Sequence, residues 1–133
     1  MKEINPAESI TRIESNSDLT REFGSHFLVE LINCPPDKLR KVKDVKQIMD
    51  EVIRKSKTSL VDVAFHQFEP EGVSGVFLIK ESHVAIHTWP EESYAAADIF
   101  TCGQEMDAYI AIEVMKEKFE AEQVRYRIIP RGF

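Results

Sequence analysis

Six segments of the chain are rich in β-branched and aromatic residues, a composition typical of β-strands. Turn residues mark breaks between them, because "EPEG" follows the second segment and "PEES" follows the fourth. These breaks predict six strands, with residue ranges 26–34, 58–68, 73–81, 82–89, 94–102 and 124–129.

Two other segments repeat their apolar residues three and four positions apart, which is the spacing of one face of an α-helix. The first follows the "PPD" of 35–37, where proline suits the start of a helix. The second precedes the last predicted strand. The two apolar faces consist of Val45, Ile48, Met49, Val52 and Ile53, and of Ala108, Ala111, Ile112, Met115 and Phe119.

The predicted order of elements is β-α-β-β-β-α-β. Two helices with one apolar face each cannot cover both sides of a sheet, so we expect them to pack together on one face. The fold class is therefore α+β, a two-layer α/β sandwich with a mainly antiparallel sheet. Residues 1–23 are polar and are predicted to be a flexible N-terminal arm, and residues 24–133 a single domain.

Composition narrows the possible partners. The 133 residues carry a formal net charge of -6, which disfavours nucleic acid and anionic membranes and mildly favours a cationic ligand. No apolar run approaches the length of a membrane span. The two cysteines, Cys34 and Cys102, do not form a CxxC pair, so we expect a reduced, cytoplasmic protein.

The run "KESHVAIHTWPEES" at 80–93 places reactive side chains inside an apolar strand. His83 and His87 share a strand face, and Cys102 would be a third zinc ligand. Because no further ligand stands at a recognised spacing, we favour ordinary rim histidines. Ser74 lacks the second glycine of a hydrolase nucleophile elbow, since Val76 stands at that position.

Three short motifs together are more specific than any single residue. "GVSG", "ESHVAIHTWPE" and "YAAADIFTCG" resemble the signature of the prokaryotic S-adenosylmethionine decarboxylase proenzymes. "AFHQFEPEGVSG" adds to the resemblance, which is dense from about Gly24 to Gly103 and thinner over the C-terminal helix and strand.

The resemblance implies self-cleavage between Glu81 and Ser82, giving a β chain of residues 1–81 and an α chain of residues 82–133. Ser82 would become a pyruvoyl group, a covalent cofactor that forms a Schiff base with the substrate amine and accepts the electrons left by CO2. It also implies that His87 is the processing base, assisted by Ser74, and that Cys102 is the proton donor in turnover.

The resemblance also implies the substrate and the assembly. Phe68 matches a ring that stacks on adenine, Glu91 a carboxylate that binds the ribose hydroxyls, and Trp89 a neighbour in the same pocket. The substrate would be S-adenosylmethionine, and the product the aminopropyl donor for spermidine synthesis. The family is a homodimer of cleaved αβ pairs, with active sites at the subunit interface.

Two rival hypotheses stay open. Glu92 and Ser93 stand where many family members carry an aromatic residue or histidine followed by glycine, and relatives of this scaffold decarboxylate arginine or ornithine. The second hypothesis is therefore a pyruvoyl-dependent arginine or ornithine decarboxylase. The third is an unprocessed binding or regulatory homologue. Retention of Phe68, Trp89 and Glu91 favours S-adenosylmethionine, because a basic amino acid needs no adenine-stacking ring.

Overall fold

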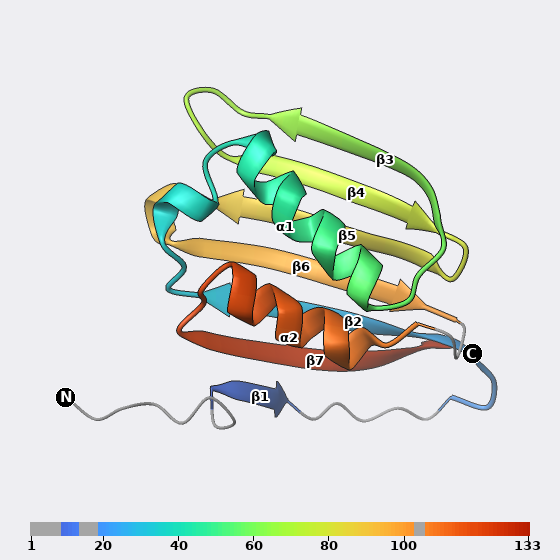
Figure 1. Cartoon of the computed structure of the whole chain (residues 1–133). Coiled ribbons are helices and arrows are strands. Elements are labelled where there is room, and N and C mark those ends of the chain that lie inside the picture. Colours follow the sequence, from blue (N-terminus) through green and yellow to red (C-terminus); the bar gives the residue numbers. More distant parts are fainter. Residues whose placement is uncertain (1–8, 14–18, 103–105) are drawn as a thin grey trace.

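The computed structural model describes residues 9–13, 19–102 and 106–133. In this part of the chain, one seven-stranded sheet is covered on one face by two helices (Figure 1). None of the described helices has the length and apolar character needed to cross a membrane. The strands are β1 (Ile10–Ile13), β2 (Glu22–Ile32), β3 (Leu60–Gln67), β4 (Val73–Ile79), β5 (Ser82–Trp89), β6 (Tyr94–Thr101) and β7 (Gln123–Gly132), and the helices are α1 (Val42–Lys55) and α2 (Ala108–Lys118).

The strands lie in the order β1-β7-β2-β6-β5-β4-β3. All neighbouring strands are antiparallel except β1 and β7, which are parallel. Strands β3 to β6 follow one another in sequence order. The sheet and its two helices confirm the predicted two-layer α+β sandwich.

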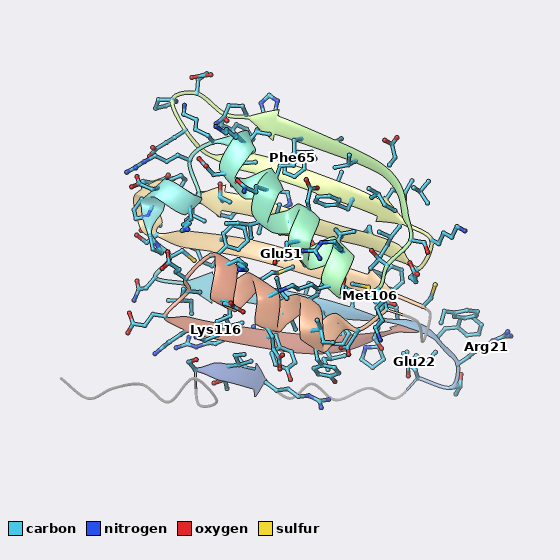
Figure 2. The ribbon with its side chains drawn as sticks, in the orientation of Figure 1. Arg21, Glu22, Glu51, Phe65, Met106 and Lys116 are labelled. Carbon is cyan, nitrogen blue, oxygen red and sulfur yellow. The ribbon has the colours of Figure 1, made fainter. Side chains whose placement is uncertain are left out.

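Both helices cover the same face of the sheet (Figure 1). The apolar face predicted for α1 is buried at Val45, Met49, Val52 and Ile53. On the same face, Phe65 of β3, which Figure 2 labels beside α1, meets Phe77 of β4 edge to face, with ring centroids 5.5 Å apart. Asp107 caps α2, because its side chain accepts a hydrogen bond from the backbone N–H of Ile110 at 3.0 Å. The core is therefore formed between the helices and this face of the sheet.

The ends of several strands differ from the predicted ranges, since β2 begins at Glu22 and β7 ends at Gly132. Two larger differences concern whole elements. Pro36 begins a short 3-10 helix, Pro36–Lys38, and α1 starts only at Val42, where the Gln67 side chain accepts the first backbone N–H at 2.8 Å. Within the predicted arm, Ile10–Ile13 forms a strand that pairs with β7. Its four residues, Ile-Thr-Arg-Ile, do not alternate apolar and polar, so they give no strand pattern within a polar stretch.

The face opposite the helices is here called the open face. Side chains alternate along each strand, so this face receives the residues between the buried ones. It carries exposed apolar side chains, including Val76 at 42% and Leu78 at 50% exposure. It also carries several histidines, which lie among these apolar side chains. The open face is therefore neither uniformly apolar nor uniformly polar.

Candidate active site

The Glu81–Ser82 bond lies at a tight hairpin between β4 and β5. Ile79 pairs with Ser82, so the turn consists of only Lys80 and Glu81. Such short turns usually need a residue that tolerates positive φ, and neither turn residue is glycine or asparagine. The positive φ instead occurs at Ser82, at 153°, a conformation that costs a non-glycine residue about 1–3 kcal/mol. The predicted cleavage bond is therefore under backbone strain.

Cys102 binds the carbonyl oxygen of Glu81 through two donors. Its backbone N–H lies 3.1 Å from this oxygen, and its thiol lies 3.0 Å from it. Two donors on one carbonyl oxygen stabilise the negative charge that develops when a nucleophile adds to the carbonyl carbon. The arrangement thus activates the Glu81 carbonyl for attack.

Gly24 on β2 allows the strands to come together at Cys102. A Cβ at Gly24 would lie 2.9 Å from the Thr101 carbonyl oxygen and 3.3 Å from the Cys102 Cβ. Both distances are shorter than ordinary carbon contacts, so a larger residue would displace the end of β6. Gly24 therefore helps to hold Cys102 against Glu81.

The Glu81 side chain is an unexpected part of this group. It is only 7% exposed, and its Oε2 atom has no hydrogen-bond partner among the described residues. A buried polar atom without a partner is costly and is often found at functional positions. The sequence marked Glu81 only as the residue before the cleavage bond and gave no signal of its burial.

A second group of predicted site residues lies at the far end of β5. Ser74 and His87 pair across β4 and β5, with the Ser74 Oγ 2.8 Å from the His87 Nδ1. Phe68, Trp89 and Glu91 line a pocket of about 240 Å³ together with them. Phe68 is 47% exposed, so it is available as a binding surface and is not a core residue.

Trp89 lines one side of the pocket in this second group. Its ring stacks on Tyr94 with centroids 5.4 Å apart and an interplanar angle of 26°. Burial, helped by a hydrogen bond to Glu30, raises the pKa of Tyr94 to about 12, so this phenol is neutral at physiological pH. The stacked pair gives the pocket a fixed aromatic wall.

The two groups are far apart within one chain. His87 lies five positions after Ser82 along the strand, which corresponds to about 17 Å. The structure therefore brings Glu81, Ser82 and Cys102 together at one end of β5. It does not bring the predicted processing base, His87, to the bond on which it was predicted to act.

The three residues considered above as zinc ligands, His83, His87 and Cys102, do not lie together in the structure. His87 bonds Ser74 and Cys102 bonds Glu81, whereas His83 bonds Asp98 at 2.8 Å. His26 also bonds Asp98, at 3.1 Å. The sequence did not single out His26 or Asp98, because neither belongs to a recognisable spacing.

The chain is similar to known proteins over most of its length. A family model described as S-adenosylmethionine decarboxylase matches residues 25–132. The chain is 44% identical over 112 residues to the S-adenosylmethionine decarboxylase proenzyme of Moorella thermoacetica, covering 84% of this chain and 90% of that protein. It is 42% identical over 111 residues to the proenzyme of the same name from Clostridium kluyveri, covering 84% and 88%.

A solved structure shares the fold. The crystal structure of the adenosylmethionine decarboxylase from Aquifex aeolicus VF5 matches with a TM-score of 0.79 at 29% identity, covering 86% of this chain and 94% of that chain. The region matched by the family model contains the strained Glu81–Ser82 bond. The fold, this bond and the matches together define the chain as a pyruvoyl-dependent carboxy-lyase that is made as a proenzyme. Within that class, the chain belongs to the S-adenosylmethionine decarboxylase family.

Proposed function

We propose that this chain cleaves itself between Glu81 and Ser82 and then decarboxylates S-adenosylmethionine, giving the aminopropyl donor for spermidine synthesis. The observation that carries the proposal is the Glu81 carbonyl, which accepts both donors of Cys102 beside the strained Ser82. Purified protein tests it: denaturing mass spectrometry is expected to give two chains, of residues 1–81 and 82–133. A single intact chain would rule out the mechanism and leave an unprocessed homologue.

The cleavage can be written from the chain's own groups. The Ser82 hydroxyl adds to the Glu81 carbonyl carbon and loses its proton to a base, and the amide nitrogen leaves as an amine, so that an ester replaces the amide. Loss of the Ser82 Cα proton then releases the Glu81 carboxylate and leaves a dehydroalanine. Addition of water releases ammonia and leaves a pyruvoyl group at residue 82. Cys102 would stabilise the first addition, because it donates to the oxygen that becomes negative.

The residues at this end of β5 fit a pyruvoyl group. Its precursor, Ser82, begins a paired strand, and the thiol of Cys102 lies beside the carbonyl that precedes it. A bound pyruvoyl group supplies an electron sink for the pair left when CO2 departs. Cys102 is the proposed donor of the proton that then returns to the substrate carbon.

Replacing Cys102 by alanine is expected to separate its two roles. Turnover is expected to fall by about 10²–10⁴-fold, the usual contribution of a general acid. Cleavage is expected to slow by only about tenfold, because the thiol hydrogen bond is lost while the backbone N–H remains. Single-turnover CO2 release and time-resolved mass spectrometry measure the two rates.

Cys34→Ala is the matched control. Cys34 is buried away from this site, and burial raises its pKa to about 12, so its thiol stays protonated. This variant is expected to keep both cleavage and turnover. Full turnover in Cys102→Ala would return Cys102 to a purely structural role.

The second group of residues supports S-adenosylmethionine as the substrate. An exposed ring at Phe68 offers a stacking surface for adenine, worth about 0.5–1.5 kcal/mol beyond its burial. Glu91 can accept charge-assisted hydrogen bonds from ribose hydroxyls, worth about 1.5–3 kcal/mol each. These groups contribute nothing to binding arginine or ornithine, so we expect S-adenosylmethionine to be decarboxylated much faster than either.

Glu91→Ala is expected to lower kcat/KM for S-adenosylmethionine by about tenfold or more, because at least one charge-assisted hydrogen bond is lost. Cleavage is expected to continue. Its control is Glu92→Ala, since Glu92 lies on the same short turn but does not line the pocket. If arginine or ornithine is the faster substrate and Glu91→Ala leaves that rate unchanged, the second hypothesis replaces the first.

We further propose that the active enzyme is a homodimer whose sites combine the two groups. Ser82 and Cys102 would come from one chain, and Ser74, His87 and the nucleoside pocket from its partner. A symmetric pairing through the open face supports this arrangement, because it covers Val76 and Leu78 and forms the same site twice. A cytoplasmic location stays a prediction from the cysteine content.

A further inference from the structure

We propose that His26, His83 and Asp98 form a binding site for one transition-metal ion of the zinc type on the open face. The Asp98 Oδ1 lies 2.8 Å from the His83 Nε2 and 3.1 Å from the His26 Nε2. The three potential ligand atoms all lie within 4.8 Å of one another. None of these side chains has a role in the cleavage or decarboxylation proposed above.

The sheet fixes the three ligands in place. His26 of β2 and His83 of β5 both pair with Phe100 of β6, one from each side. Asp98 lies two residues before Phe100, so its side chain points to the same face. The Phe100 ring contacts both imidazoles, with centroids 5.5 Å and 5.9 Å away. All three side chains are partly buried, and little rearrangement would be needed for binding.

The chemistry of the ligands selects the metal. Two imidazoles and one carboxylate form a common catalytic zinc set, with one position left for water. Zinc ligands at about 2.0–2.2 Å in a tetrahedron lie about 3.4 Å apart, slightly farther than the two contacts with Asp98 and shorter than the 4.8 Å within which all three ligand atoms lie. Magnesium and calcium prefer ligand sets made only of oxygen, so they are not expected here. A neutral imidazole that ligates through Nε2 carries its proton on Nδ1, so binding would require the ring protons that face Asp98 to shift from Nε2 to Nδ1.

The positive charge of Arg131 disfavours metal binding at this site. Its Nη1 lies 3.4 Å from the His26 Nδ1, and its guanidinium lies 5.7 Å from the Phe100 ring centroid. A neutral His26 bound to the metal through Nε2 must carry its single ring proton on Nδ1, which then faces the Arg131 cation. Arg131 therefore has to turn away when the metal binds, and its charge lowers the affinity.

The test is a calorimetric titration of the metal-stripped, full-length protein with Zn²⁺ and with Mg²⁺. We expect one Zn²⁺ per chain and no binding of Mg²⁺. His26→Ala and Asp98→Asn are expected to weaken Zn²⁺ binding by at least about tenfold, because even the outer partners of metal ligands contribute about 10–100-fold. Arg131→Gln is expected to strengthen it. Co²⁺ is expected to give the visible absorption of a tetrahedral site in the unmodified chain and lose it in Asp98→Asn.

His66→Ala is the matched control, because His66 lies on the same face but outside the cluster. It is expected to bind Zn²⁺ as the unmodified chain does. The proposal is overturned if the unmodified chain does not bind Zn²⁺. It is also overturned if His26→Ala and Asp98→Asn bind it normally while Cys102→Ala or His87→Ala does not, since the metal would then lie elsewhere.

Discussion

A Ser82→Ala chain is expected to remain a single polypeptide and to release no CO2 from S-adenosylmethionine. Without the Ser82 hydroxyl the exchange of amide for ester at the Glu81–Ser82 bond cannot begin, and without a serine no pyruvoyl group can form. The loss should be complete rather than partial, because two successive functions depend on the same side chain. Denaturing mass spectrometry and a CO2-release assay measure both.

Ser59→Ala is the control for this variant. The Ser59 carbonyl accepts the backbone N–H of Lys80 at 2.9 Å, so Ser59 contacts the same turn without using its hydroxyl there. It is expected to be cleaved and active. Two chains from Ser82→Ala, or CO2 release by it, would contradict the assignment of residue 82.

Ser82→Gly tests the strain separately from the chemistry. Like Ser82→Ala, it has no hydroxyl and should stay uncleaved. Glycine adopts a φ of 153° at little cost, whereas alanine retains the strain of about 1–3 kcal/mol. The greater freedom of glycine in the unfolded chain costs the glycine variant about 0.5–1 kcal/mol. The free energy of unfolding of Ser82→Gly should therefore exceed that of Ser82→Ala by about 1 kcal/mol. Urea unfolding of the two uncleaved variants measures the difference.

Local patterns in the sequence were enough to predict most of the fold. The spacing of Val45, Met49 and Val52 identified the buried face of α1, and the run of β-rich segments identified strands β2 to β7. Strand β1 was missed because its pairing with β7 depends on a distant segment. The start of α1 was placed too early, because proline also begins 3-10 helices such as Pro36–Lys38.

The candidate site could be predicted only as a set of residues. Motif resemblance singled out Ser82, His87 and Cys102, but it carried no information about the distances between them. The contact of Cys102 with Glu81 depends on the end of β6 lying beside the β4–β5 turn. The meeting of His26 with Asp98 depends on the register between β2 and β6, which spacing along one strand does not specify.

Coexpression of Ser82→Ala with His87→Ala is expected to restore cleavage that each variant lacks alone. Within one chain Ser82 and His87 are about 17 Å apart along β5, so the base must come from a second copy. In a mixed dimer, the His87→Ala chain supplies Ser82 and Cys102, and the Ser82→Ala chain supplies His87. Random pairing puts about half of the His87→Ala chains in mixed dimers, so about half should be cleaved and about a quarter of all sites should be active.

The pair Ser74→Ala and His87→Ala is the decisive control. Ser74 and His87 belong to the same group, with their side chains 2.8 Å apart, so every mixed site lacks one of the two. This pair is therefore expected to show no restored cleavage. Distinct mass tags on the two chains identify which one is cleaved, and in the first pair it must be the His87→Ala chain. If the first pair stays intact, Ser82 and His87 act within one chain and the strand β5 must rearrange before cleavage. If the control pair is restored equally well, Ser74 and His87 do not act together from one chain, and the proposed division of the site is wrong.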